Sequence, residues 1–321
     1  MLRLEDAWVW DSWIADDGER YHLFFLKAPS ALGDPSLRHA KAVIGHATSV
    51  DLVDWRIEPD ALGPRPGAWD DLALWTGSTV RGDDGVWHLF YTAISTRGHG
   101  LRDQRIGAAE SADLLTFRRI GDAPIVVADP HRYRTLDEDE SASETWRDPF
   151  VFRVPGDGTW HMLITARAKG GTRNADGVLA HATSSDLRSW TVGPALGRPG
   201  GFGQIEVPQV RRIDGTWVLV FTCHPQEQTE EHIAEFGRYC TWSVTAGSPL
   251  GPWDLERALP FEAEPALFAA PLVQRRDGGW ALLGFRNTEP EGVFAFEIVD
   301  PIPVRLEGGR LVAAVRTVSS G

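Results

Sequence analysis

GTWHMLITA at residues 158–166 is one of five copies of a short pattern in which a glycine precedes an aromatic residue and a run of apolar residues. The other copies are GERYHLFFL at 18–26, GVWHLFYTA at 85–93, GTWVLVFTC at 215–223 and GGWALLGFR at 278–286. Their first glycines are separated by 67, 73, 57 and 63 residues. Repeats of this length, built from several short strands with turn glycines between them, are typical of β-propeller blades.

Two further elements accompany this pattern. One follows it as GHATSVDLVDW at 45–55, GAAESADLLTF at 107–117 and AHATSSDLRSW at 180–190, and predicts a strand, a Ser-x-Asp-Leu turn and a return to an aromatic residue. The other precedes it in all five copies, as WVWDSWIA at 8–15, LWTGSTVRG at 74–82, WRDPFVFRV at 146–154, IEVPQVRRI at 205–213 and FAAPLVQRR at 268–276. We expect these last segments to be the innermost strands, which line a central channel.

The repeats predict an all-β fold, a single-domain five-bladed β-propeller that spans residues 1–321 with about four strands in each blade. The copies run from residue 8 to about residue 300, which leaves too few residues for a second domain. Helical periodicity is nearly absent. The best candidate is the acidic stretch QEQTEEHIAEFGR at 226–238, which could equally be a mobile loop.

Composition and charge narrow the classes of function. The 42% hydrophobic and 24% charged fractions are those of an ordinary globular protein. No stretch approaches the roughly 20 apolar residues of a spanning helix, and the N-terminus lacks a signal-peptide pattern, so we expect a cytoplasmic protein. The net charge of −13 disfavours nucleic acid and membranes as partners and suits a small, neutral carbohydrate. The 14 tryptophans suit a carbohydrate-handling β protein, although most recur at repeat positions and must pack between strands.

Three of the five innermost segments contain a carboxylate at a similar place: Asp11 in W-V-W-D-S-W, Asp148 in W-R-D-P and Glu206 in I-E-V-P. Innermost strands converge on the propeller axis, so the three acids can meet at one mouth of the channel. One such acid could simply cap strand amides, but three in register would perturb one another's pKa in a shared pocket. Glycoside cleavage needs such a set, with one acid to protonate the leaving oxygen and one carboxylate to attack the anomeric carbon or activate water.

The segment GHATSVDLVDWRIEPDAL, which begins at residue 45, closely resembles the W-G-H-A-x-S-x-D-L-x-x-W stretch of glycoside hydrolase family 32, the invertases, inulinases and levanases. LWTGSTV, WRDPFVF, QIEVPQV and LFAAPLV resemble the family's F-S-G-S, R-D-P, E-C-P and F-Y-A-A-Q motifs. The opening W-V-W-D-S-W departs from the family's W-M-N-D-P-N-G and looks more like the W-D-T-W of family 68, the levansucrases, which belongs to the same clan. The resemblance covers nearly the whole chain, and we expect the family's usual C-terminal β-sandwich to be absent.

This resemblance implies roles for individual residues. Asp11 would be the nucleophile, Asp148 the transition-state stabiliser that binds ring hydroxyls, and Glu206 the general acid/base. The expected reaction is hydrolysis of β-fructofuranosides or related small furanosides with retention of configuration, through a covalent glycosyl-enzyme intermediate and without a cofactor or metal. The residues expected to bind substrate around the acids are Trp10, Trp13, Leu26, Trp75, Thr76, Arg147 and Phe268, with Arg147 orienting Asp148.

The sequence departs from family 32 in the expected pocket. The family's fructose-binding Gln is replaced by Leu26, no Trp occurs between Trp13 and Trp55, and Trp10 replaces the Asn before the nucleophile. A polar contact and an aromatic wall are therefore expected to be lost, and each missing hydroxyl contact typically costs about 1–3 kcal/mol. We expect sucrose to be a poor substrate and the natural one to be a small, less usual fructoside or related furanoside met inside the cell.

Other interpretations remain open at the level of sequence. A levansucrase-type fructosyltransferase differs from a hydrolase only in whether a sugar or water resolves the intermediate. An arabinofuranosidase-like propeller hydrolase would carry acids on similar strands, although R-D-P argues against it, and a non-catalytic sugar-binding propeller would need no register of acids. The tract DEDE at 137–140 indicates a solvated loop more than a calcium site, and the ten histidines form no His-x-x-x-His pattern.

Overall fold

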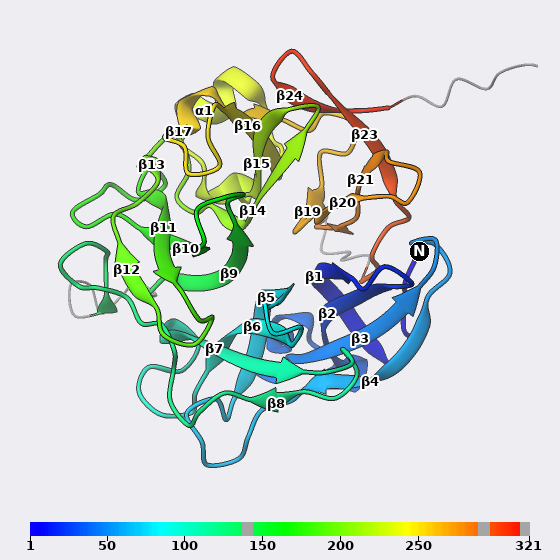
Figure 1. Cartoon of the computed structure of the whole chain (residues 1–321). Helices are drawn as coiled ribbons and strands as arrows, with labels where there is room; N and C mark the ends of the chain where they lie inside the picture. The colour runs from blue at the N-terminus through cyan, green and yellow to red at the C-terminus, as the bar shows by residue number, and fades with distance from the viewer. Residues whose placement is uncertain (137–143, 288–295, 315–321) are drawn as a thin grey trace, which may run out of the picture.

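The computed structural model describes residues 1–136, 144–287 and 296–314, and their strands form five four-stranded antiparallel sheets around a central axis (Figure 1). The first blade contains β1 (Ala7–Asp16), β2 (Tyr21–Pro29), β3 (Val43–Ser49) and β4 (Arg56–Leu62). The second contains β5 (Ala73–Arg81), β6 (Trp87–Ile94), β7 (Gln104–Ser111) and β8 (Arg118–Arg119). The third contains β9 (Trp146–Arg153), β10 (Trp160–Arg167), β11 (Gly177–Ser184) and β12 (Thr191–Gly193). The all-β five-bladed propeller predicted from the repeats is confirmed.

The fourth blade contains β14 (Glu206–Ile213), β15 (Thr216–Thr222), β16 (Thr241–Ala246) and β18 (Leu259–Pro260), and the fifth contains β20 (Leu272–Gln274), β21 (Trp280–Leu282), β23 (Ile302–Glu307) and β24 (Arg310–Ala313). Two short pairs join β13 (Gly197–Arg198) to β17 (Trp253–Asp254) and β19 (Leu267–Phe268) to β22 (Phe285–Arg286). The innermost strands are β1, β5, β9, β14 and β20, each of which overlaps a segment assigned to the channel from sequence.

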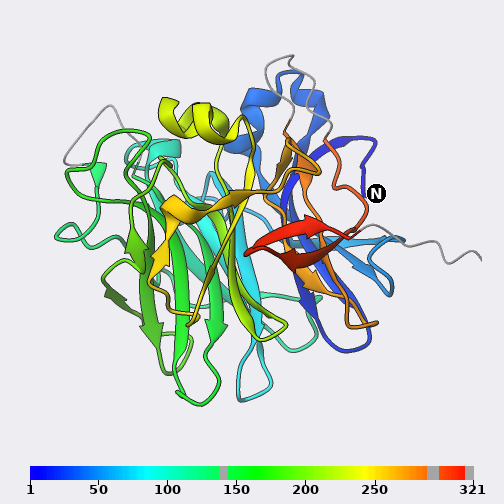
Figure 2. The same cartoon turned by 90° about the horizontal axis from the view of Figure 1, so that it is seen from above.

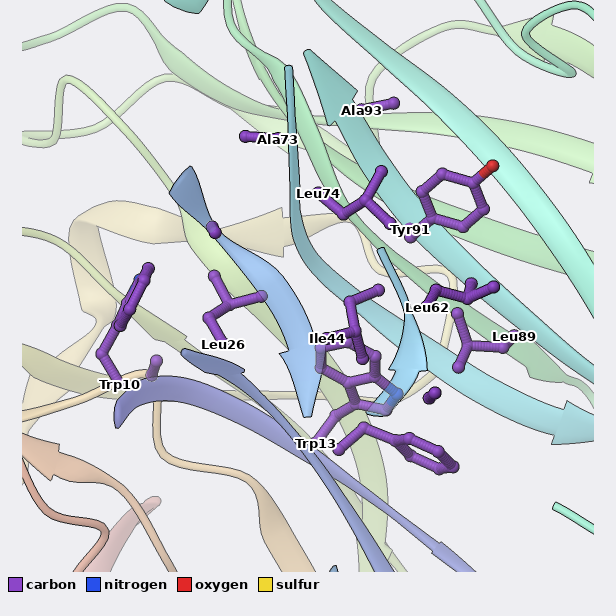
Figure 3. Close-up of a cluster of buried hydrophobic side chains, with 14 of the residues drawn as sticks. Trp10, Trp13, Leu26, Ile44, Leu62, Ala73, Leu74, Leu89, Tyr91 and Ala93 are labelled. Carbon is purple, nitrogen blue, oxygen red and sulfur yellow. The ribbon is translucent and has the colours of Figure 1, made fainter. Parts of the chain in front are cut away.

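The blades are held together by alternating side chains that pack on both faces of each sheet. Leu23 and Phe25 of β2 join the cluster shared with blade five, whereas Phe24 and Leu26 join the cluster shared with blade two. Successive side chains of a strand point to opposite faces, so a sheet covered on both sides needs a continuous apolar run. This explains why the repeated pattern carries apolar residues at consecutive positions rather than only at alternate ones. Figure 3 shows part of the cluster between blades one and two.

The Ser-x-Asp-Leu turns predicted after the third strand of three blades all use the serine hydroxyl and the aspartate carboxylate as acceptors for backbone N–H groups. In the first, the Ser49 hydroxyl accepts from the N–H groups of Asp51 and Leu52, and the Asp51 carboxylate accepts from the two N–H groups that follow Leu52. The leucine has a positive φ in each turn, at 69°, 61° and 62° for Leu52, Leu114 and Leu187. The side chains thus satisfy the backbone donors that the sharp reversal leaves without strand partners.

The ring is closed by the N-terminal segment, because Leu2 pairs with Ile298 through two backbone hydrogen bonds of 2.9 and 3.0 Å. The acidic stretch left open as helix or loop contains one short helix, α1 (Glu230–Phe236), capped by the Thr229 hydroxyl. Figure 2 shows α1, in yellow-green, on the same face of the propeller as the blue segment η2 (Pro35–Lys41), which connects β2 to β3. No helix within the described ranges is long and apolar enough to cross a bilayer.

Candidate active site

Irregularities in the innermost strands determine where the polar side chains point. In β1, Val9 pairs with Lys27 and Ser12 with Phe25, so Trp10 and Asp11 together oppose Leu26. The same kind of bulge lies at Thr76 in β5, at Asp148 in β9 and just after Glu206 in β14. A β-bulge bends its strand and redirects a side chain, which is why such bulges are common beside active sites. Four blades thus present a polar residue at the same level of the channel.

These side chains meet in a pocket of about 460 Å³, here called the site pocket. Asp11, Asp148 and Glu206 all line it, together with six of the seven residues expected to bind substrate: Trp10, Leu26, Trp75, Thr76, Arg147 and Phe268. Its other lining residues are Arg38, His39, Leu101, Arg102, Gln104, Gln204, His224, Phe285 and Asn287. The pocket combines apolar walls with a few convergent charged groups, as binding sites for small molecules do.

Asp11 projects from the bulge of β1 and accepts a 2.6 Å hydrogen bond from the hydroxyl of Thr76, in the neighbouring blade. Burial raises the pKa of Asp11 to about 6, and the negative charge of Asp148 adds to this effect, whereas the Thr76 hydrogen bond and Arg38 act in the opposite direction. Above pH 6 the carboxyl of Asp11 is therefore ionised and can act as a nucleophile.

Glu206 differs from Asp11 in its protonation state at neutral pH. Burial raises the pKa of its carboxyl to about 8, the guanidinium of Arg147 opposes the shift, and the charges of Glu227 and Asp148 add to it. At neutral pH Glu206 therefore carries a proton that it can donate. Two carboxyls of one pocket with separated pKa values divide into a proton donor and an anion, which is the pattern of acid/base assignments in hydrolases.

Arg147 contacts the carboxyls of both Glu206 and Asp148. Its Nη2 lies 3.1 Å from Glu206 Oε2, and its Nε lies 3.4 Å from Asp148 Oδ2. Asp148 has a φ of 56° and accepts hydrogen bonds from the Thr165 hydroxyl at 3.0 Å and the Val207 N–H at 3.2 Å. Burial raises the pKa of Asp148, and Arg147 opposes the shift. A strained backbone held by this many contacts fixes the direction of the carboxylate.

One wall of the site pocket is aromatic. Its residues are not those of the family 32 segment whose Trp this chain lacks. His39 of η2 lies edge-on to both Trp10 and Trp75, with ring centroids 6.0 and 5.9 Å apart. The indole N–H of Trp75 donates a 2.8 Å bond to the His39 carbonyl oxygen, and the Arg38 guanidinium lies over the Trp10 ring. Trp10, His39 and Trp75 thus give the pocket an aromatic wall of its own, to which η2 contributes the imidazole ring.

Trp13 is the one residue among the seven expected to bind substrate that lies outside the site pocket. The bulge in β1 adds one residue to the strand, so even-numbered side chains face blade two before the bulge and odd-numbered ones after it. Trp8, Trp10 and Trp13 therefore all join the cluster between blades one and two. Trp13 stacks on Phe24 and donates a 3.0 Å hydrogen bond to the Thr79 hydroxyl. Figure 3 shows it away from Trp10, beside Ile44. It also lines a separate cavity of about 380 Å³ further along the channel.

Several residues of the site were not identified from sequence. Gln104 and Gln204 both accept hydrogen bonds from the guanidinium of Arg147, and η2 contributes Arg38 and His39. Burial lowers the pKa of His39 to about 3, so its ring is neutral. His224 accepts a 3.2 Å hydrogen bond from the Gln226 N–H and lines the pocket. None belongs to the repeated pattern, so no signal in the repeats could have identified them.

The possible calcium tract DEDE at 137–140 lies outside the described residues. Among residues 1–136, 144–287 and 296–314, no three His, Cys, Asp or Glu side chains converge as a metal site would require.

Fold and site together define the class of protein, a five-bladed propeller with three carboxyls at one end of its channel. The Glycosyl hydrolases family 32 N-terminal domain matches residues 13–247, which include Asp148 and Glu206 and begin two residues after Asp11. The chain belongs to glycoside hydrolase family 32.

Relatives of known function agree with this placement. The chain is 31% identical to a sucrose-6-phosphate hydrolase of Bacillus subtilis over 208 residues, which are 62% of this chain and 38% of that protein. It is 29% identical to a sucrose-6-phosphate hydrolase of Klebsiella pneumoniae over 289 residues, which are 85% of this chain and 54% of that protein. The chain thus spans about half the length, or less, of these curated relatives.

Solved structures show the same fold at lower identity. An inulosucrase from Halalkalicoccus jeotgali bound to kestose superposes with a TM-score of 0.76 at 20% identity, covering 96% of this chain and 87% of that chain. A Bombyx mori family 32 β-fructofuranosidase in complex with sucrose gives 0.74 at 19% identity, with 98% and 64% covered.

Proposed function

We propose that the protein is a retaining glycoside hydrolase that acts on β-fructofuranosides or related small furanosides. The observation that carries this proposal is the set of three carboxyls in one pocket, where Asp11 is an anion above pH 6 and Glu206 keeps its proton up to about pH 8. Arg147 bridges Glu206 and Asp148, and the charge of Asp148 acts on Asp11, so the three acids interact with one another rather than being buried separately.

In the proposed reaction Glu206 gives its proton to the glycosidic oxygen while the Asp11 carboxylate attacks the anomeric carbon, so that a furanosyl ester on Asp11 forms and the leaving alcohol departs. Glu206, now ionised, then takes a proton from a water molecule whose oxygen attacks the same carbon, which releases the sugar and restores both carboxyls. Asp148 binds ring hydroxyls whose contacts strengthen as positive charge develops on the ring. Two inversions at one carbon retain its configuration.

Incubation with sucrose, inulin, levan and aryl furanosides, followed by identification of the released sugar, tests this proposal. Free fructose as the main product supports a hydrolase, whereas oligomeric products would indicate a levansucrase-type transferase. Cleavage of aryl arabinofuranosides alone would favour the arabinofuranosidase-like alternative. Binding of these sugars without cleavage would indicate a non-catalytic sugar-binding propeller.

A specific observation favours a phosphorylated fructoside as the preferred substrate. The site pocket is lined by Arg38 and Arg102 in addition to Arg147, although the whole chain carries a net charge of −13. Guanidinium groups suit phosphate recognition, and the two relatives described above are sucrose-6-phosphate hydrolases. This proposal agrees with the expectation that sucrose is poorly cleaved and that the substrate is met in the cytoplasm.

Kinetics on sucrose and sucrose-6-phosphate test the phosphate preference. We expect kcat/KM to be at least about tenfold higher for the phosphorylated substrate, since one charge-assisted contact contributes about 1.5–3 kcal/mol. Arg102→Gln should reduce this ratio while leaving the value for sucrose within about threefold of wild type. Arg38→Gln should also reduce the ratio, and is compared well above pH 6 because Arg38 also lowers the pKa of Asp11. Cleavage of sucrose at equal or higher efficiency would refute the preference and leave an ordinary β-fructofuranosidase.

A further inference from the structure

Glu227 lies behind the site pocket, at the end of the short segment η5 (Pro225–Glu227) that connects β15 to α1. Its carboxylate Oε1 accepts a 2.6 Å hydrogen bond from the side-chain amide of Gln204. The oxygen of the same amide accepts a hydrogen bond from Arg147, whose Nη2 contacts Glu206. A continuous chain of contacts thus runs from Glu227 through Gln204 and Arg147 to the carboxyl of the proposed acid/base.

The two intermediate side chains have little freedom in this arrangement. Gln204 and Arg147 are 7% and 8% exposed, so the hydrogen bonds that hold them are not readily replaced by bulk water. An amide whose oxygen faces a guanidinium must present its N–H groups on the other side, and Glu227 supplies the acceptor there. The charged acceptor also fixes which end of the Gln204 amide faces Arg147.

Glu227 is itself anchored by backbone and side-chain contacts. Its carbonyl oxygen accepts a 2.7 Å bond from the Gly203 N–H, and a side chain at Gly203 would come within 2.9 Å of that oxygen. Its Oε1 lies 3.7 Å from Arg167 Nη2, and Arg167 in turn lies 3.8 Å from the buried Asp176. Acidic and basic groups therefore alternate outward from the pocket, which stabilises the position of Glu227.

The charge of Glu227 acts on the same groups. It raises the pKa of Glu206, after the larger effect of burial, and it also raises the pKa of Arg147. The other charged or titratable groups around Glu206, from every element that lines the pocket or packs against it, are Asp11, Arg38, His39, Arg102, Arg147, Asp148, Cys223, His224 and Cys240.

We propose that Glu227 is a positioning residue of the active site. It orients Gln204, so that Gln204 holds the Arg147 guanidinium against Glu206. The carboxylate of Glu227 also places a negative charge behind that guanidinium. This inference rests on the proposed function, because it assigns Glu206 as the proton donor. It assigns a role to an acidic residue outside the repeats whose carboxylate contacts Gln204 behind the pocket. No substrate contact is assigned to Glu227.

Glu227→Gln tests the inference because it keeps the shape and the acceptor oxygen but removes the charge. We expect the alkaline limb of the pH profile of kcat/KM to move to lower pH by about one unit, since Glu206 then loses its proton more readily. Activity near pH 6 should change by less than about threefold. Glu231→Gln, which removes the same charge from the exposed surface of α1, should leave the profile unchanged and is the matched control.

Glu227→Asp separates the charge from the contact. The charge stays, so the alkaline limb should stay within about 0.3 units of wild type, whereas the shorter side chain no longer reaches Gln204 and kcat should fall at every pH. If both variants lose activity equally at all pH values with an unmoved limb, Glu227 has only a structural role and the inference is overturned.

Titration of the Glu206 carboxyl by NMR, with carbon-13-labelled glutamate and assignment by Glu206→Gln, gives a readout that does not require turnover. A lower midpoint in Glu227→Gln supports the inference even if no furanoside is cleaved, in which case the proposed function alone fails. An unchanged midpoint overturns the inference even if the wild type is active. If Glu227→Gln does not fold, Glu227→Asp decides, because its Glu206 midpoint should match wild type while its Gln204 amide resonances shift.

Discussion

The Thr76 hydroxyl donates a 2.6 Å hydrogen bond to Asp11 Oδ2, which joins the bulge of one blade to the bulge of the next. Both residues are extra residues of their strands, and neither would face the pocket in a regular β-strand. Thr76 stabilises the ionised form of Asp11 and so opposes the burial that raises its pKa to about 6. The proposed nucleophile thus depends on a contact between two blades.

Replacement of Thr76 by valine should therefore change the pH dependence of catalysis. Valine has nearly the same shape but no hydroxyl, so the pKa of Asp11 should rise and the acid limb of kcat/KM should move to higher pH by about one unit. The rate on the alkaline side, where Asp11 is ionised in both proteins, should change much less. Thr76→Ser keeps the hydroxyl and should restore the wild-type limb. An acid limb that stays in place would show that another group controls it.

Neutral substitutions of the three acids should reduce the catalytic rate in different ways. Asp11→Asn removes the nucleophile and should reduce kcat by about four orders of magnitude or more on every substrate. Glu206→Gln should cost about 10²–10⁴-fold on fructosides with alkyl leaving groups but little in the first step with an acidic phenol, which needs no protonation. Asp148→Asn should slow all substrates alike, because it acts on the ring. Steady-state kinetics on matched substrates checks this, and equal small losses would indicate structural acids.

The configuration of the first-formed product tests the covalent step. Proton NMR during early hydrolysis of a β-fructofuranoside should detect the β-anomer of free fructose before mutarotation. The expected separation of the Asp11 and Glu206 carboxyls in a ligand-bound structure is about 5–5.5 Å, against about 6.5–9.5 Å for an inverting pair. Initial release of the α-anomer would exclude the furanosyl ester on Asp11.

The bulge of blade two should tolerate no side chain at its glycine. A Cβ at Gly77 would lie 1.8 Å from the backbone oxygen of Phe90, so the two strands would have to separate. We expect Gly77→Ala to lower the free energy of unfolding by about 3 kcal/mol or more and to reduce activity through Thr76. Gly247→Ala, whose Cβ would meet no atom within 4 Å, is the control. Denaturant unfolding of the two variants measures the difference, and equal midpoints would contradict the close approach of β5 and β6 at this bulge.

The sequence by itself determined the number of blades, the innermost strands and the three acids. These features depend on repetition and on alternation along single strands, which are local properties. Asp11, Asp148 and Glu206 could be selected because equivalent positions of a propeller converge on one axis, whatever the details of each blade. Short elements outside the repeats, such as the residues around α1, gave no comparable signal.

Only the tertiary structure decided which tryptophans and which loops reach the pocket. Trp10 lines it and Trp13 does not, because Trp13 lies further along the channel, although the bulge in β1 brings both tryptophans into the same cluster between blades one and two. His39 reaches it and Glu227 lies behind it, both in segments between strands, at distances along the chain that no pattern encodes. Such contacts form only when separate blades close into a ring, so their physical basis is long-range packing rather than local sequence.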